Sequence, residues 1–357
     1  MIGIIFIGDI TLCPFLCKYT DELKKRDIKY EIVHWNKSGE VLDVSNAITL
    51  NKPSINHRSP FLKIKDFFIF RKFAKKAIKE RNYNKLIIFT TMTAIVLYDV
   101  LLSKKYKKNY IFDYRDVSYE YIPPFSYLLK GVIKNSSFTS ISSKGFLNVL
   151  PKNYPYIMAH NINLGDLAYK KDELIKNNKL PIRVSYIGHL RIGRYLFDLI
   201  DLFKNDKRFT LKIIGGGDNY KALLEYAKGL DNIRLTGRYK NKERINFLEE
   251  TDILCYNYPT SFLNQNALAN KFYDALIFKK PLWGNLETFS GKLIAKEGVG
   301  VSLLNDDKDL LNKIFDYYKK FNPLEFCDNA NTLISEILKE EEEYNAKIGE
   351  WLTSKKL

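Results

Sequence analysis

The apolar positions of this chain alternate between short continuous runs and longer segments with helical spacing. The opening residues predict a buried strand over Ile2 to Ile7, a turn at Gly8, a helix over roughly Phe15 to Arg26 and a second strand over Tyr30 to Trp35. Such a unit forms parallel pairs, so the Gly8 loop lies at the carboxyl edge of a sheet, where ligands bind. A simple tight turn explains Gly8 equally well.

The same alternation continues along the chain and predicts an α/β protein with parallel sheets. In the first half, Asn36 to Ser59 is polar and rich in turn residues, which predicts a loop over a cleft. A strand followed by a helix is predicted within Lys85 to Lys105, and further strands at Asn109 to Phe112 and Phe138 to Ser142. In the second half, the predicted strands are Arg183 to Ile187, Thr210 to Ile214, Asn232 to Thr236 and Ile253 to Tyr256.

The chain of 357 residues is long for a single hydrophobic core. Prolines and a polar stretch interrupt the pattern between residues 151 and 179. We therefore predict a first domain over residues 1–165, a linker over 166–180, a second domain over 181–335 and a C-terminal helix over 336–357 that can return to the first domain. His160 lies beside this boundary and is a candidate catalytic residue, with a structural role as the alternative.

The segment Asn264 to Trp283 combines a short amphipathic helix with a strand that starts at about Pro281. Asn270 and Lys271 fall in the predicted first turn, where unpaired N–H groups and the helix dipole attract an anion. Asp274 can accept hydrogen bonds from the hydroxyl groups of a sugar. An anion site beside a diol site suits a nucleotide sugar. The alternative is an ordinary helix whose Lys271 and Asp274 are solvated.

Loops that follow the other strands of the second half are rich in glycine and in cations. Arg191 and Arg194 follow the first of these strands, and forked guanidinium groups recognise phosphate. Gly215 and Gly217 follow the second, in a run that matches neither a dinucleotide fingerprint nor a P-loop, and Tyr239 follows the third. Parallel strands end at one edge of their sheet, so we expect these loops to form one site.

Charged residues follow the predicted strand at Asn109 to Phe112. Arg115, Asp116 and Glu120 are expected at the mouth of a cleft, because burying them unpaired would cost several kcal/mol. A carboxylate at this position can serve as the base for an acceptor hydroxyl group. The alternative is that Arg115 ties neighbouring carboxylates together structurally.

The net charge of +16 is concentrated in the first half of the chain. Residues 1–180 contain 30 Lys and Arg against 16 Asp and Glu, a net +14, whereas the rest contain 27 against 25, a net +2. Within the first half, Phe61 to Lys85 carries nine basic residues, two acidic residues and five phenylalanines, which is typical of an amphipathic helix at an anionic membrane surface. Alternatively, its apolar stripe packs on the sheet and its lysines are solvated.

The remaining composition narrows the class of protein. The chain has four cysteines without paired spacing and four histidines, so we expect reduced thiols and no metal site. No segment has the pattern of a transmembrane helix, and the N-terminus lacks the basic leader of an export signal. We expect a cytoplasmic protein that is held peripherally on the inner face of the cell membrane. The charge would also suit a nucleic-acid-binding protein, but no recognised module for that function is present.

Several sequence blocks occur in a characteristic order. They are YEIVHW, FDYRDVSYE, ISSKGF, HN, YIGHLR, KIIGGG, NIRLTGRY, ALANKFYDALIFKKPLWG and GVGV. Together they resemble GT-B glycosyltransferases, GT4-like and of the type that builds bacterial capsular and other surface polysaccharides. The resemblance implies two Rossmann-like domains whose parallel sheets face each other across a cleft. It also implies transfer of a sugar from a nucleotide diphosphate sugar, bound by the second domain, to a hydroxyl group of a lipid-linked saccharide, bound by the first.

Carried over by position, the resemblance gives roles to individual residues. The residues implied to face the donor diphosphate are Arg191, Arg194, Asn270 and Lys271. Those implied to border the ribose and base are Asp274, Gly215, Gly217 and Tyr239. On the acceptor side the implied residues are Gly8, Arg115 and Glu120, with Asp116 and His160 as catalytic candidates.

One departure from the family pattern concerns the stereochemical outcome. Many retaining members have two glutamates separated by seven residues, whereas this chain has Asn266 and Asp274 at those places, so the outcome is not predicted. Fixed cations would stabilise the departing diphosphate, so neither a metal nor another cofactor is expected. A nucleotide-sugar epimerase on the same scaffold, a basic nucleic-acid-binding protein and an inactive scaffold subunit remain alternatives.

Overall fold

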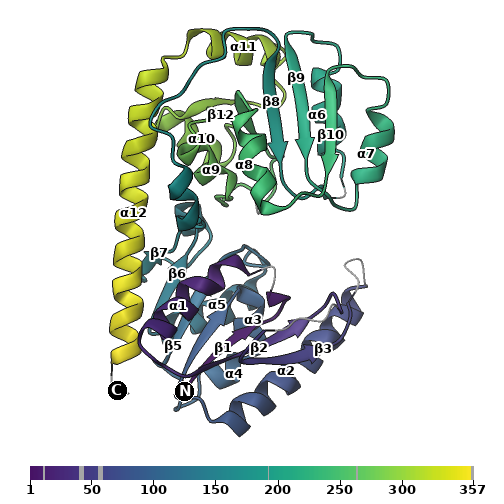
Figure 1. The fold of residues 1–357 in the computed structure, drawn as a ribbon. Helices are drawn as coiled ribbons and strands as arrows, with labels where there is room; N and C mark the ends of the chain where they lie inside the picture. The colour runs from purple at the N-terminus through teal and green to yellow at the C-terminus, as the bar shows by residue number, and fades with distance from the viewer. Residues whose placement is uncertain (11–12, 40–43, 55–58, 192, 263, 355–357) are drawn as a thin grey trace. The chain divides into compact units, whose positions relative to one another are not determined.

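The computed structural model describes residues 1–10, 13–39, 44–54, 59–191, 193–262 and 264–354. The chain divides into two compact units, Met1–His160 with Lys339–Leu357, and Asn161–Leu338. Each unit contains one parallel sheet with helices on both faces (Figure 1). We call them unit 1 and unit 2.

The sheet of unit 1 has the order β3-β2-β1-β4-β5-β6-β7, with every pair of neighbours parallel. After β1, the strands β2 and β3 are added on one side of it, and β4 to β7 are then added on the other side. The strand order therefore reverses between β1 and β4. Ligands of open α/β sheets bind beyond the carboxyl ends of the strands at such a switch point. The strands are β1 (Ile2–Phe6), β2 (Tyr30–Asn36), β3 (Ala47–Asn51), β4 (Lys85–Phe89), β5 (Tyr110–Tyr114), β6 (Phe138–Ile141) and β7 (Tyr156–Met158).

Helices from both ends of the chain cover unit 1. Tyr19 of α1 and Tyr344 of α12 share one hydrophobic core with alternate residues of β1 and β4. On the opposite face α2 packs against β2, where Phe70 stacks on Trp35 with ring centroids 6.3 Å apart. The helices are η2 (Pro14–Leu16), α1 (Cys17–Lys25), α2 (Pro60–Arg81), α3 (Thr91–Val96), α4 (Tyr98–Leu101), α5 (Pro123–Asn135), η3 (Lys144–Asn148) and the end of α12 (Pro323–Thr353).

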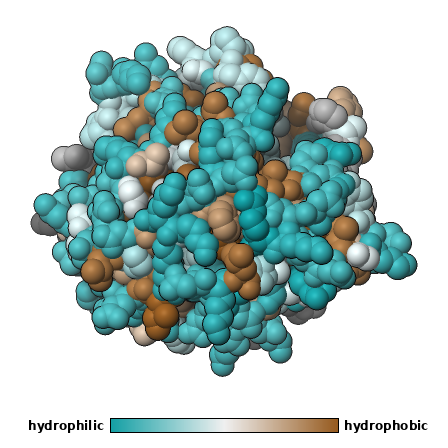
Figure 2. Space-filling view, turned by 90° about the horizontal axis from the view of Figure 1, so that it is seen from above, coloured by the Kyte–Doolittle hydropathy of each residue, from teal (hydrophilic) through white to brown (hydrophobic). Residues whose placement is uncertain are grey.

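The parallel sheet of unit 2 has the order β10-β9-β8-β11-β12-β13, and its switch point lies between β8 and β11. The strands are β8 (Ile182–Ile187), β9 (Phe209–Ile214), β10 (Ile233–Gly237), β11 (Ile253–Tyr256), β12 (Leu282–Asn285) and β13 (Gly300–Leu303). Figure 2 looks onto the side where α11 lies in Figure 1, and this face is largely hydrophilic with small separate hydrophobic groups.

Two sets of helices bury the faces of this second sheet. One face is covered by α8, α9, α10 and the start of α12, and the other by α6, α7 and α11. A short helix precedes β8. The bounds are η4 (Leu164–Tyr169), α6 (Tyr195–Phe203), α7 (Tyr220–Tyr226), α8 (Asn241–Glu249), α9 (Lys271–Ile277), α10 (Phe289–Lys296) and α11 (Leu310–Lys320).

Most predicted elements are confirmed, and β11 has the predicted bounds. The prediction of a loop over Asn36 to Ser59 is wrong, because β3 pairs with β2 inside that segment; residues 40–43 and 55–58 of the segment lie outside the described part of the chain. At the sheet edge β3 is only half-buried, so it lacks the apolar run that marks the other strands. The prediction also omitted α5, β7 and α10. Among the described residues, no helix is both long and apolar enough to cross a bilayer.

Candidate active site

The side chain of Lys271 is buried at the switch point of the unit 2 sheet. It is 7 % exposed, and its Nζ lies 3.6 Å from the ring centroid of Tyr186 on β8 and 4.8 Å from that of Tyr258, just beyond β11. No residue in the described part of the chain accepts a hydrogen bond from this Nζ. Burial lowers the pKa of Lys271, since the charged form loses its hydration, and the neighbouring phenol of Tyr186 opposes part of this decrease.

Glycines bring the loops after β8 and β9 against each other and against Lys271. A Cβ atom at Gly188 would lie 3.3 Å from Nζ of Lys271, and one at Gly215 would lie 1.8 Å from the carbonyl oxygen of Gly188. Gly217 also approaches the loop after β8, because an added Cβ would lie 2.4 Å from the carbonyl oxygen of Leu190. Larger residues at 215 and 217 would push these loops apart. The structure therefore gives the two glycines a packing reason that the sequence alone did not supply.

The two arginines after β8 differ in their surroundings. Arg191 is exposed, and its charge reaches the phenol of Tyr258, whose pKa it lowers against the larger effect of burial. Arg191 and Lys271 both oppose the increase that burial causes in the pKa of Tyr186. Arg194 is also exposed but pairs with acidic residues of its own helix, at 2.8 Å from Asp198 and 3.3 Å from Asp201. The electrostatic effects of Arg191 reach the aromatic rings around Lys271, whereas Arg194 is paired with Asp198 and Asp201.

Asp274 is held by an arginine that the sequence analysis missed. One nitrogen of the Arg244 guanidinium group on α8 pairs with Oδ1 of Asp274, and another pairs with Oδ2 of Asp166 on η4. All three side chains are buried: 12 % of Arg244, 8 % of Asp274 and 7 % of Asp166 is exposed. Burial raises the pKa of Asp274, and Arg244 partly opposes this increase.

No sequence signal identified Arg244, because its two partners lie 30 and 78 residues away along the chain. Two other predicted residues border this group. Tyr239 is half-buried, with its ring edge-on to Phe247 at 5.8 Å, and Asn270 is exposed immediately before α9. Asn266, at the place of the family's first glutamate, is buried and donates to the carbonyl oxygen of Phe262 at 3.0 Å.

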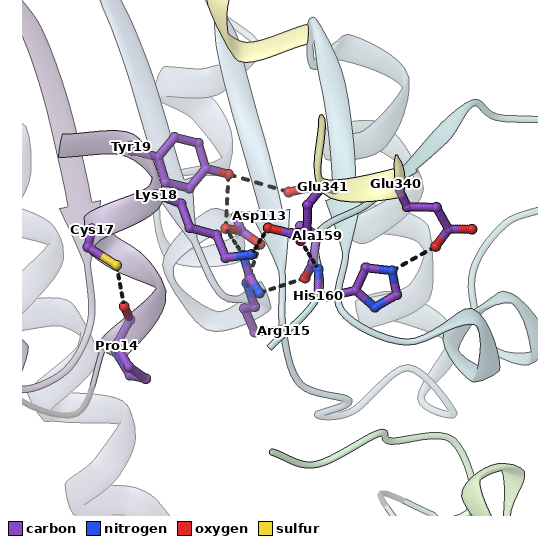
Figure 3. A network of polar contacts seen from close by, with 11 residues as sticks. Pro14, Cys17, Lys18, Tyr19, Asp113, Arg115, Ala159, His160, Glu340 and Glu341 are labelled. Carbon is purple, nitrogen blue, oxygen red and sulfur yellow. Dashed lines mark hydrogen bonds and ion pairs between the residues drawn. The ribbon is translucent and has the colours of Figure 1, made fainter. Parts of the chain in front are cut away.

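In unit 1, Arg115, which was expected at the mouth of a cleft, is buried in an ion pair. Its Nε is 2.6 Å from Oδ1 of Asp113, and another of its nitrogens donates to the carbonyl oxygen of Ala159 at 2.8 Å (Figure 3). Asp113 also accepts a hydrogen bond from Tyr19 at 2.9 Å. Arg115 can be buried here because β5 extends to Tyr114 and takes Asp113 into the core, where the two side chains pair. The structure thus shows the alternative given above, in which Arg115 pairs with a neighbouring carboxylate, here that of Asp113.

His160 contacts the end of α12. Its backbone N–H donates to Glu341 at 2.6 Å, and its Nε2 lies 2.7 Å from a carboxylate oxygen of Glu340 (Figure 3). This hydrogen bond is the main reason that the pKa of Glu340 falls to about 2, with help from Lys144 at 2.7 Å. Glu341 is also paired with Lys18 of α1. These contacts hold the end of α12 against unit 1 at His160, the last residue of the first segment of unit 1.

The other predicted residues of unit 1 lie at the carboxyl edge of its sheet. Asp116 is exposed just beyond β5. Glu120 is buried, accepts a hydrogen bond from Tyr114 at 2.9 Å, and has a pKa that burial raises. Gly8 lies two residues after the end of β1 and packs against the ring of Phe6. A Cβ atom added at Gly8 would lie 2.7 Å from that ring.

Solved structures match this chain over nearly its whole length, although no protein-family model and no curated protein sequence matches it. WaaG, a glycosyltransferase involved in lipopolysaccharide biosynthesis, has a TM-score of 0.65 and 12 % identity, with 98 % of this chain and 99 % of that chain covered. A glycosyltransferase from Rickettsia africae has a TM-score of 0.66 and 13 % identity, with 99 % of each chain covered. HepE from Anabaena, in complex with UDP and glucose, has a TM-score of 0.65 and 12 % identity, with 97 % and 98 % covered.

The chain has the GT-B fold. Two parallel α/β sheets in one chain, predicted from the sequence, are thereby confirmed. In this GT-B chain the carboxyl edge of the unit 2 sheet carries Lys271, Arg191 and the Arg244 group. The carboxyl edge of the unit 1 sheet carries Gly8, Asp116 and Glu120.

Proposed function

We propose that the protein is a glycosyltransferase that moves a sugar from a nucleoside diphosphate sugar to a hydroxyl group. The observation that carries the proposal is Lys271, a buried cation at the switch point of unit 2 for which the described residues provide no acceptor. Burying a charge without a partner is costly, so such a group is expected to bind an anion. Arg191 adds a second positive charge whose electrostatic effect reaches Tyr186 and Tyr258.

The chemistry that follows is displacement of the nucleoside diphosphate. The bond between the sugar C1 and the diphosphate breaks, the acceptor oxygen bonds to C1, and its proton passes to a carboxylate, for which we propose Asp116. Lys271 and Arg191 stabilise the charge on the departing diphosphate, so the proposal includes no metal or other cofactor. Asp274, fixed by Arg244 through one oxygen, presents the other oxygen to the ribose hydroxyl groups.

A thermal-shift screen of nucleotide sugars, followed by a transfer assay with the best ligand, tests this proposal. One nucleotide sugar should stabilise the protein more than its bare nucleoside diphosphate does. At 100 times its dissociation constant, the expected stabilisation over the unliganded protein is about 2.7 kcal/mol. Sugar should then appear on an added acceptor. Epimerised nucleotide sugar formed from the donor alone would contradict the proposal and favour the epimerase alternative, and absence of any stabilisation would favour an inactive scaffold.

We further propose that the acceptor is a lipid-linked saccharide at an anionic membrane, as in synthesis of capsule or other surface polysaccharide. The support is α2, whose second half packs on the sheet while its first half exposes hydrophobic side chains, with Phe61 78 % and Phe68 66 % exposed. Lys63 and Lys65 are exposed beside them. Exposed aromatic and basic side chains on one helix suit the headgroup region of anionic lipids.

Replacing Phe61 and Phe68 together with serine should weaken binding to phosphatidylglycerol vesicles at least tenfold, because two large apolar side chains no longer enter the interface. Sedimentation with vesicles measures the change, and binding should decrease as salt increases. As a matched control, Ile175→Ser removes an exposed apolar side chain of unit 2 and should leave binding unchanged. Equal binding to neutral vesicles, or a preference for oligonucleotides, would contradict the membrane proposal.

A further inference from the structure

Thr90 has a backbone conformation that threonine rarely adopts. Its φ is 67° and its ψ is 153°, a region that is populated almost only by glycine. The Cβ branch makes this conformation more costly than the left-handed turns formed elsewhere in unit 1, such as Asn82 at φ 51° and ψ 44°. Residues of this kind persist only where the surrounding structure holds them, and they concentrate at functional sites.

Hydrogen bonds connect Thr90 to β5 and, through Thr93, to the loop after β1. The N–H of Thr90 donates to the carbonyl oxygen of Asp113 on β5 at 2.9 Å, and its hydroxyl group lies 3.2 Å from that of Thr93. Thr93 in turn accepts a hydrogen bond from the N–H of Ile7 at 3.0 Å. The Thr90 turn therefore connects the loop after β1 with the end of β5.

The position of this turn in the sheet points to a ligand. Thr90 directly follows β4, which pairs with β1 at the switch point of unit 1. The hydroxyl group of Thr91 lies 3.4 Å from the carbonyl oxygen of Asp116 and 3.5 Å from a carboxylate oxygen of Glu120. Thr91 and Thr93 are buried, whereas Thr90 is half-exposed. Its side chain is thus the one of the three that a ligand can reach.

We propose that Thr90 binds the acceptor saccharide, with its hydroxyl group hydrogen-bonded to a sugar hydroxyl next to the one that reacts at Asp116. This inference rests on the proposed glycosyl transfer and deepens it. A threonine hydroxyl group both donates and accepts, as a sugar hydroxyl does, so one contact satisfies both groups. The backbone strain is retained because the same turn fixes the loop that carries Asp116.

The test is to replace Thr90 with glycine, which fits the backbone without strain. The melting temperature of Thr90→Gly should stay the same or rise by about 2 °C, while the KM for the acceptor should rise at least tenfold and the KM for the donor should change less than twofold. Thr90→Ser keeps the hydroxyl group and should keep the acceptor KM within threefold. Thr90→Ala loses only the contact and should raise the acceptor KM as glycine does.

Asn153→Gly is the matched control, since Asn153 has a φ of 66° and lies before β7, away from the carboxyl edge of the sheet. It should leave both KM values unchanged. An unchanged acceptor KM in Thr90→Gly and Thr90→Ala would overturn the inference and make the strain purely structural. Failure of the proposed function is distinguishable, because the wild-type protein itself would then transfer no sugar.

Discussion

Replacing Lys271 with methionine is expected to lower transfer about a hundredfold while leaving the protein at least as stable as the wild type. The loss follows from removing a fixed cation that opposes the departing diphosphate. The stability follows from the burial of Lys271 among Tyr186 and Tyr258, with no acceptor for Nζ in the part of the chain that the structure describes. Methionine fills this space without the cost of desolvating a charge. Steady-state rates and thermal unfolding measure the two effects.

A second buried lysine provides the control. Lys279 follows α9, is 1 % exposed, and donates from Nζ to the carbonyl oxygen of Leu276 at 3.0 Å and to Asn331 at 2.9 Å. Lys279→Met should therefore lose about 1–3 kcal/mol of stability and retain the activity of its folded fraction. If Lys271→Met keeps wild-type turnover at limiting and saturating donor, Lys271 does not bind the diphosphate.

The protonation of Lys271 also predicts a difference in pH dependence. Burial lowers the pKa of Lys271 below its ordinary value of 10.5, so the unfolded chain binds this proton more tightly than the folded chain does. The wild type should consequently gain stability as the pH rises toward 10.5, and Lys271→Met should lack this part of the gain. Unfolding curves of the two proteins between neutral and alkaline pH compare them directly.

Replacing Arg244 with methionine is expected to destabilise unit 2 by about 3 kcal/mol or more, because two buried carboxylates lose their shared cation. Donor binding should weaken as well, since Asp274 is no longer held in place. Without Arg244, burial and the neighbouring charge of Asp166 raise the pKa of Asp274 further above the ordinary 3.8, and Lys271 opposes them. The folded variant then binds protons more tightly than its unfolded chain, so its stability should decrease as the pH rises above about 3.8.

Two further variants separate charge from position. Combining Arg244→Met with Asp166→Asn and Asp274→Asn removes all three charges and should restore most of the stability but not the donor affinity. Lys171→Met, which breaks a pair with Glu249 in which the two side chains are 48 % and 50 % exposed, should cost less than about 1 kcal/mol and leave transfer unchanged. Wild-type donor affinity in the triple variant would remove Asp274 from the ribose contact.

The order of elements could be predicted from the sequence because the strands of both sheets are short apolar runs. Buried parallel strands such as β4 and β11 exclude polar side chains along nearly their whole length, so their pattern is local. Edge strands lack this property, which is why β3 was predicted as a loop. The short helix α9 was predicted because its apolar spacing and Pro281 mark its limits in the sequence.

Polar groups of the site were harder to predict because their partners come from distant segments. The spacing of Asp113 and Arg115 gives no indication that Tyr19 and Ala159 complete their hydrogen bonds inside the core. Likewise, Arg244 appears in the sequence as one cation of an ordinary amphipathic helix. The position of Lys271 was predicted, but its enclosure by aromatic rings depends on how two strands and a helix pack.

The helix α12 has a consequence for how the protein is made. Unit 1 contains the first residues of the chain, yet its core includes Tyr344, Ile348 and Trp351. Lys85, at the start of β4, also donates to carbonyl oxygens near the C-terminus. During translation, all of unit 2 is therefore synthesised before the C-terminal residues that complete the core of unit 1. Unit 1 is translated first, but it can finish folding only after the end of α12 has been made.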